Sequence, residues 1–250
     1  MDWLWGTLAG FGLGAVAGPL AEPWSRRLQR FARKAARESP VDVHVEWDQA
    51  QVWAGAPPWV SFSNYFEGGL PSEPAPADGK EWSGWAERNA GSDWRLTMLV
   101  VTVSARTDAT VVMDTPRVLA TRRDVPLGVG VPWPAPGGAD LNPRRYDIDL
   151  SAGSPPWVSF RDDDAPRNAQ PKPAPSWRLG PGDVERLHIW AKATDDAMYD
   201  WTMDLPLLVD GRRVLVRVSK AGQPFVTVGQ RQPHRSLIWT GKGWSDSPHG

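Results

Sequence analysis

The feature that most limits the fold is an alternation of apolar and polar residues that begins at residue 41. Val41, Val43 and Val45 alternate with polar side chains, a pattern typical of a strand with one buried face. No segment of helical period separates the later apolar runs, and parallel sheets normally need helical crossovers. We therefore predict an all-β fold, an antiparallel immunoglobulin-like β-sandwich. The other strands are expected at Trp59–Phe62, Leu96–Ala105, Thr110–Met113, Arg117–Thr121, Val129–Trp133, Arg145–Leu150, Trp157–Phe160, Arg186–Ala193, Asp200–Val209, Arg213–Ser219, Pro224–Val228 and Leu237–Thr240.

Turn residues and loop composition support this prediction. Asp210-Gly211 lies between two apolar runs, which is a strong signal for a two-residue β-hairpin. Pro181-Gly182-Asp183 precedes another expected strand. The segments 64–93 and 161–178 are rich in Pro, Gly, Ala and charged residues, so we expect long surface loops there.

A short segment occurs twice in the chain. Ala54–Phe62 and Ala152–Phe160 agree at eight of nine positions, and each has a Pro-Pro pair before a Trp. Their offset of 98 residues is close to the length of one immunoglobulin-like unit. Because the flanking residues diverge at once, we predict one sandwich over residues 40–250. Two small sandwiches, at about 41–140 and 141–250, are the alternative.

The N-terminal segment has a different character. The run from Trp3 to Leu20 has 18 residues without a charge and would be about 27 Å long as a helix, close to the hydrocarbon thickness of a bilayer. We therefore predict a transmembrane helix over residues 1–22. Glycine recurs at every fourth position, which predicts self-association through one helix face, at Gly6, Gly10, Gly14 and Gly18. An apolar leader that merely tolerates small residues, or a flexible tail, is the alternative.

Residues 23–39 are predicted to form a basic amphipathic helix beside the membrane. Trp24, Leu28 and Phe31 fall on one side of this helix. The basic residues fall on the other side and are Arg26, Arg27, Arg30, Arg33, Lys34 and Arg37. We expect the helix to lie against anionic lipid headgroups, with Trp3, Trp5 and Trp24 as interfacial anchors. A solvated helix packed on the following domain is the alternative.

The charge distribution predicts the topology. Residues 1–39 carry six basic and three acidic residues, whereas the whole chain has a net charge of -1. Because basic residues flank membrane spans on the cytoplasmic side, we expect a single-pass protein of the cell membrane whose soluble domain is cytoplasmic. The absence of Cys agrees with a reducing compartment. The near-zero net charge argues against nucleic acid as a partner.

The sequence contains no recognisable catalytic or metal-binding pattern. Without Cys there is no thiolate nucleophile and no Cys-ligated metal. The acidic run Asp162-Asp163-Asp164 lacks the turn glycine of a calcium loop. Metal-ligand spacing is also missing among His44, His188, His234 and His249. No phosphate-binding, dinucleotide-binding or nucleophile-elbow motif is present, so we expect no cofactor, no metal and no enzymatic activity.

Tryptophan is unusually frequent, with 16 residues against 6 Phe and 3 Tyr. Four of these residues lie in expected strands and are interpreted as core, namely Trp47, Trp94, Trp190 and Trp201. Trp82 and Trp85 lie instead in the expected loop 64–93. They either cap the end of the sandwich or form a flat platform for a sugar ring or a proline-rich peptide.

Several stretches between residues 94 and 230 combine strand and turn patterns. They are TVSARTDATVVMDTPRVLATRRDVPLG, a Gly-Gly pair followed by RRYDIDL, LGPGDVERLHIWAKA, and WTMDLPLLVDGRRVLVRVSKAGQPF. In these stretches, which cover about half of the chain, the sequence resembles a group of uncharacterised actinomycete proteins. The resemblance implies a membrane-tethered β-sandwich domain and brings no known substrate, cofactor or catalytic residue.

Together these features predict a membrane-anchored β-sandwich that is a non-enzymatic interaction or scaffold module. The expected partners are the lipid bilayer, a second copy through the transmembrane helix, and a protein whose identity the sequence does not specify. The alternative is an extracytoplasmic carbohydrate-binding sandwich that uses Trp82 and Trp85. The two hypotheses require opposite topologies.

Overall fold

The computed structural model describes residues 39–52, 63–77, 79–106, 108–132, 144–162, 170, 172–173, 175–230, 233 and 235–247. Residues 1–38, which carry the predicted transmembrane helix and nearly all of the predicted amphipathic helix, lie outside this part. So does the expected strand Trp59–Phe62. Within the described ranges, no helix combines the length and the apolar character that a membrane span requires.

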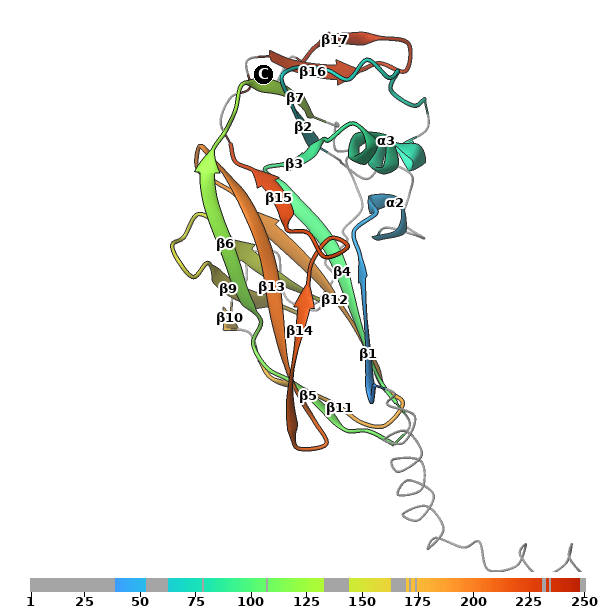
Figure 1. The fold of residues 1–250 in the computed structure, drawn as a ribbon, viewed down its shortest axis with the longest axis vertical. Helices are drawn as coiled ribbons and strands as arrows, with labels where there is room; N and C mark the ends of the chain where they lie inside the picture. Colours follow the sequence, from blue (N-terminus) through green and yellow to red (C-terminus); the bar gives the residue numbers. More distant parts are fainter. Residues whose placement is uncertain are drawn as a thin grey trace, which may run out of the picture.

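The described strands form two sheets, and part of the larger sheet packs face to face on the smaller one (Figure 1). The six-stranded sheet has the order β1 (Val41–Glu46), β4 (Leu96–Ala105), β12 (Val184–Lys192), β8 (Arg145–Asp149), β9 (Trp157–Arg161), β10 (Lys172–Pro173). The 11-stranded sheet has the order β11 (Trp177–Leu179), β5 (Val111–Met113), β13 (Ala197–Val209), β15 (Phe225–Val228), β3 (Ser92–Trp94), β2 (Ser63–Glu67), β7 (Gly128–Pro132), β16 (Arg235–Trp239), β17 (Trp244–Asp246). Its strand β13 also pairs with β6 (Arg117–Asp124) and β14 (Arg212–Val218).

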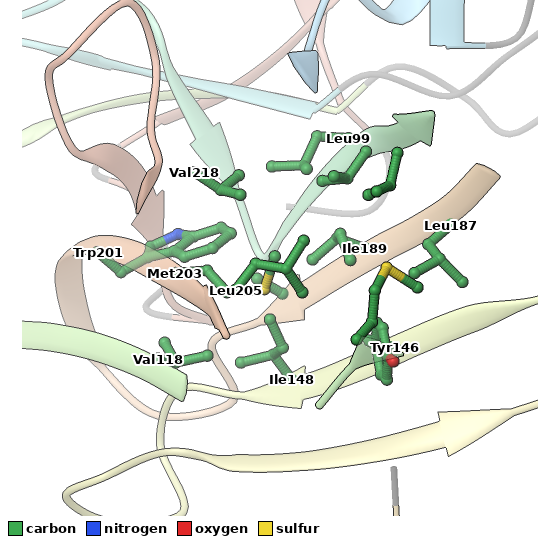
Figure 2. Close-up of a cluster of buried hydrophobic side chains, with 14 of the residues drawn as sticks. Leu99, Val118, Tyr146, Ile148, Leu187, Ile189, Trp201, Met203, Leu205 and Val218 are labelled. Atoms are coloured by element: carbon green, nitrogen blue, oxygen red, sulfur yellow. The ribbon is translucent and has the colours of Figure 1, made fainter. Parts of the chain in front are cut away.

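The core between the sheets follows from the period of two in the long strands. In β13, Trp201, Met203 and Leu205 point to one side and are each 1% exposed. Leu99 in β4 and Ile189 in β12 face them from the six-stranded sheet and are 0% exposed. Figure 2 shows these five side chains in one continuous cluster. Because strands supply nearly all of this core, the all-β prediction is confirmed.

The hairpin β13–β14 forms at the predicted turn. Asp210 and Gly211 have φ angles of +48° and +80°, as the type I′ turn requires. The two strands then pair from Val209 opposite Arg212 to Met203 opposite Val218. β4 likewise has the bounds that its sequence pattern predicts. Local signals are therefore sufficient for these elements.

The prediction of purely antiparallel sheets is wrong. In the described part of the chain, β8 pairs in parallel with β12, β3 with β15, and β7 with β16. A parallel pair needs a crossover connection, but the crossover need not be a helix. Between β8 and β12 the chain passes through β9, β10 and β11, and β11 belongs to the other sheet. Short strands thus replace the helical crossover that the prediction assumed.

Strands from both halves of the chain are neighbours in each sheet. β4 lies between β1 and β12, and β13 pairs with β6. The alternative of two sandwiches divided near residue 140 does not match this strand order.

The segment 64–93, expected to be a surface loop, mostly forms regular structure. It contains the end of β2, the 3-10 helix η1 (Gly79–Glu81), the helix α3 (Trp82–Arg88) and β3. Helix α3 lies at the end of the sandwich beside β2 and β3 (Figure 1). Its buried face belongs to a second core, here called the α3 cluster, which consists of Phe66, Ala75, Trp82, Trp85, Ala86, Val129, Val131 and Leu237. The loop prediction was wrong because a helix of seven residues shows too little periodicity and depends on tertiary packing.

Other short elements, among them β17, also have no counterpart in the sequence predictions. The helix α2 (Gln49–Val52) follows β1, and the expected loop 161–178 contributes β10 and β11. β11 pairs with β5, which places Trp177 opposite Met113. Such short elements are not distinguishable by periodicity.

Candidate functional site

The residues predicted to contact the membrane lie outside the described part of the chain. They are the helix-packing residues Gly6, Gly10, Gly14 and Gly18 and the interface residues Trp3, Trp5, Trp24, Arg26, Arg27, Arg30, Arg33, Lys34 and Arg37. Their roles stay predictions.

Trp82 and Trp85, considered as a ligand platform, lie inside the α3 cluster. Trp82 is 0% exposed and Trp85 is 1% exposed. Their ring centroids are 4.8 Å apart, and the ring of Trp244 lies 6.3 and 6.2 Å from them. The indole N–H of Trp82 donates to Asn64 Oδ1 at 2.8 Å, and that of Trp85 donates to the Glu73 carbonyl at 3.3 Å. With no open ring face, these residues cap the sandwich, and the carbohydrate hypothesis loses the platform on which it depended.

A hollow of about 440 Å³ lies on the outer face of the 11-stranded sheet, at β13 and β14. It is large enough to take a small organic group or several peptide side chains. We call it the β14 groove; its lining residues are Asp114, Arg117, Pro206, Leu207, Leu208, Arg213, Val214 and Leu215.

The hairpin register explains why apolar side chains reach this outer face. Since Leu205 and Leu207 point into the core, the intervening Pro206 and the following Leu208 point outward. Leu215 of β14 lies directly opposite Pro206 in the ladder. Leu215 is 60% exposed and Leu208 is 36% exposed. A contiguous apolar patch of this kind marks a contact surface more often than scattered exposed leucines do.

Basic side chains border the β14 groove. β14 carries three arginines and no acidic residue. Arg217 makes a two-point ion pair with Asp204, in which the Nη2 to Oδ2 distance is 3.2 Å. Arg212 and Arg213 form no ion pair within the described ranges. Asp114, which also lines the groove, accepts a hydrogen bond from Ser176 Oγ at 3.0 Å. Of the charged residues that line the groove, Arg117 and Arg213 are basic and Asp114 is acidic, so the groove has an apolar floor and a net positive border.

The sequence contains a signal for this groove that strand prediction alone does not use. The run Leu205–Val209 is apolar at every position, so both faces of the strand are apolar. Such runs are typical of strands that are covered on both sides. The outward apolar residues Pro206 and Leu208 are the part of this pattern that the sandwich itself does not explain.

A second pocket, of about 60 Å³, lies between the sandwich and α3. Gln49, Glu87, Asp93 and Lys220 are among its lining residues. Burial raises the pKa of Asp93 to about 6, against a hydrogen bond from Thr97 and the charge of Lys220, which both lower it. The ammonium group of Lys220 lies 3.3 Å from Glu87 Oε1. The volume corresponds to about two water molecules, so the pocket is suited to hydration of these groups rather than to a larger ligand.

The raised pKa of Asp93 predicts how stability changes with pH. The folded protein binds this proton more tightly than the unfolded chain, whose Asp93 has the ordinary pKa of 3.8. Protonation of Asp93 therefore contributes to the stability of the folded protein. This contribution is fully present below about pH 4 and is lost as the pH rises through about 6. Asp93→Asn removes this titrating group. As the pH rises from about 4 to about 7, the free energy of unfolding of Asp93→Asn is therefore expected to increase relative to that of the wild type by on the order of 1–3 kcal/mol. Urea unfolding of both proteins at the two pH values measures this difference; equal pH profiles would contradict it.

A hydrogen-bonded cluster surrounds Asp195, in the turn between β12 and β13. Its carboxylate accepts hydrogen bonds from Ser151 Oγ at 3.1 Å, Tyr199 OH at 2.8 Å and Arg122 Nε at 3.3 Å. Burial alone would raise the pKa of Asp195, but these hydrogen bonds outweigh burial and lower it. Ser151 Oγ also accepts from the backbone N–H of Thr194 at 2.9 Å. These hydrogen bonds fix the turn between β12 and β13.

The described histidines do not form a metal site. Burial, with added repulsion from Arg186 and Arg145, lowers the pKa of His188 to about 4, so its imidazole is neutral near pH 7. Across the described residues, no group of three or more His, Asp or Glu side chains is arranged to hold a metal ion.

Comparison of the chain with models of protein families, with curated proteins and with solved structures finds no match. The resemblance to actinomycete proteins therefore stays a prediction.

Proposed function

We propose that this protein is a single-pass membrane protein whose β-sandwich is a non-enzymatic interaction module, with the β14 groove as the docking surface for a partner protein. The observation that carries the proposal is the exposure of Leu208 and Leu215 beside Pro206, on a sheet whose inner face already supplies the core. Burial of apolar area contributes about 25 cal/mol per Å². Covering this patch therefore favours the binding of a partner.

The membrane part of the proposal rests on residues 1–39. Their uncharged run, four-residue glycine spacing and basic helix favour a spanning segment that self-associates and leaves the sandwich in the cytoplasm. β1 begins at Val41, so the sandwich follows the proposed anchor without a long linker. The face-to-face sheets support an immunoglobulin-like architecture, modified by the parallel strand pairs.

Photocrosslinking in intact cells tests the docking surface and the anchor together. A photoreactive amino acid in place of Leu215 is expected to give one discrete crosslinked product. This product is expected to stay in the membrane pellet after carbonate extraction. The matched control places the same amino acid at Leu127, which is 75% exposed and lies in the loop between β6 and β7, outside the groove. A second variant carries the photoreactive group in place of Leu208. Adding the substitution Leu215→Asp to this variant is expected to abolish the crosslinked product and to leave the unfolding midpoint unchanged.

The outcomes separate the parts of the proposal. Equal crosslinking at positions 127 and 215 would remove the docking function of the groove. Release of the protein by carbonate would remove the spanning segment. Because the chain has no native Cys, a single Cys in place of Leu127 also reports the topology. Labelling of that Cys in intact cells by a membrane-impermeant reagent would place the sandwich outside the cell.

A further inference from the structure

Within the described ranges, the edge of β14 that faces away from β13 is open. β14 pairs with β13 from Arg212 to Val218, and no other strand of the described chain pairs with it. β15 continues along the same side of β13, and β3 pairs with its outer edge at Thr227 and Val228. An open edge presents a row of backbone N–H and C=O groups with which a further strand can pair. Neither Pro nor Gly interrupts β14, so pairing can extend over the whole strand.

The side chains of β14 define what a complementary strand must carry. Arg213, Leu215 and Arg217 lie on the outer face of β14, and Arg213 and Leu215 also line the β14 groove. Val214 and Val216 lie on the other face, where Val214 is still 37% exposed. Residues directly opposite each other in a sheet stabilise it when both are apolar or when their charges are opposite. A fitting strand therefore has acidic residues opposite Arg213 and Arg217 and apolar residues between them.

A second copy of β14 does not meet this requirement. Antiparallel pairing of two β14 strands centred on Leu215 places Arg213 of one copy opposite Arg217 of the other. Like charges in directly opposite positions destabilise a sheet. β14 has no acidic residue of its own, and Asp204 of β13 compensates Arg217 but not Arg213. Its arginines thus oppose edge-to-edge self-association and at the same time favour an acidic strand.

A lipid surface is also a weaker match than a strand. Anionic headgroups would satisfy the charges of Arg212 and Arg213, but the open backbone groups of β14 need hydrogen-bond partners in a fixed row. An extended peptide supplies both the row of backbone partners and the side chains.

We infer that the partner binds through an extended acidic segment that adds a strand to β14, with the pattern acidic, apolar, apolar, apolar, acidic opposite Arg213 to Arg217. The inference rests on the proposed function, because it names the partner chemistry of the same groove. Backbone pairing supplies the affinity, and the apolar residue opposite Leu215 packs beside Leu215, at the β14 border of the groove. Arg213 decides the charge preference, since Arg217 is already engaged by Asp204.

Binding of synthetic peptides to the full-length protein in neutral phosphatidylcholine nanodiscs tests this inference by fluorescence anisotropy. The first peptide has Glu-Val-Leu-Val-Glu at its centre. One control replaces both Glu by Lys, and another keeps the side chains but carries N-methyl groups on the central amides, which removes the N–H donors. The Glu peptide is expected to bind at least about tenfold more tightly than either control. The variant Arg213→Glu is expected to invert the preference in favour of the Lys peptide.

Each other outcome overturns a stated part of the inference. Equal binding of the N-methylated peptide overturns strand addition. Equal binding of the Glu and Lys peptides, or an unchanged preference in Arg213→Glu, overturns the acidic partner. Arg213-dependent binding of anionic phosphatidylserine vesicles without peptide binding assigns the surface to lipid instead. If crosslinking at position 215 in cells persists while peptide binding fails, the docking function stands and only the inference on its partner fails.

Discussion

Trp82→Ala is expected to lower the free energy of unfolding by about 3–5 kcal/mol, a large part of the roughly 5–15 kcal/mol typical of a domain. The side chain is 0% exposed, packs on Trp85 at 4.8 Å between ring centroids, and donates to Asn64 Oδ1 at 2.8 Å. Its removal leaves a cavity in the α3 cluster and an unsatisfied amide oxygen in Asn64. Urea unfolding followed by far-UV circular dichroism measures the loss.

Trp157→Ala is the matched control for this prediction. Trp157 is 56% exposed on β9, so its removal is expected to change the free energy of unfolding by less than about 1 kcal/mol. If Trp82→Ala costs no more than Trp157→Ala, Trp82 is not packed in the α3 cluster. The ligand-platform interpretation of Trp82 would then be open again.

Gly229→Ala is expected to cost at least about 3 kcal/mol, because the position leaves no room for a Cβ atom. An added Cβ would collide with the backbone carbonyl oxygen of Asp195 and would lie 2.7 Å from that of Ala197. The Gly229 N–H donates to the Ala197 carbonyl at 2.7 Å, and the Gln230 N–H donates to the Asp195 carbonyl at 2.8 Å. Relief of the collision therefore requires breaking the bonds that hold the turn before β13 against the end of β15.

Gly243→Ala provides the comparison for this position. A Cβ at Gly243 would meet no atom within 4 Å, and its φ lies outside the left-handed region. The substitution is expected to change the free energy of unfolding by less than about 0.5 kcal/mol, measured by the same urea titration. Equal stability of the two Ala variants would contradict the close approach of the backbone at Gly229.

Several strands were predictable because their signals are local. The alternation in Leu96–Ala105 yields the bounds of β4, and Asp210-Gly211 yields the turn between β13 and β14. The helix α3 was not predictable, because its seven residues are stabilised by contacts with Phe66, Val131 and Leu237, which are distant in the sequence. Because these contacts are not visible in the sequence, the Gly- and Pro-rich composition of segment 64–93 predicted a loop around Trp82 and Trp85. It did not indicate whether the two side chains are buried.

The candidate site was predictable only in part. The apolar run Leu205–Val209 shows that both faces of β13 are apolar, but it does not show which face is left uncovered. That outcome depends on strand order, which places β6, β13 and β14 side by side and leaves the outer edge of β14 open in the described chain. The raised pKa of Asp93 likewise depends on burial beneath α3, which no neighbouring residue in the sequence indicates.

Sequence alone determined the all-β class, most strand positions, the hairpin turn at Asp210-Gly211 and the segregation of charge between residues 1–39 and the rest of the chain. Tertiary structure decided which strands pair, which pairs are parallel, that Trp82 and Trp85 are buried, and that Leu215 is exposed beside an open strand edge. The physical reason is the separation in sequence of the residues that interact. Periodicity and turn geometry arise among residues a few positions apart, whereas burial and pairing arise between segments that only the folded chain brings together.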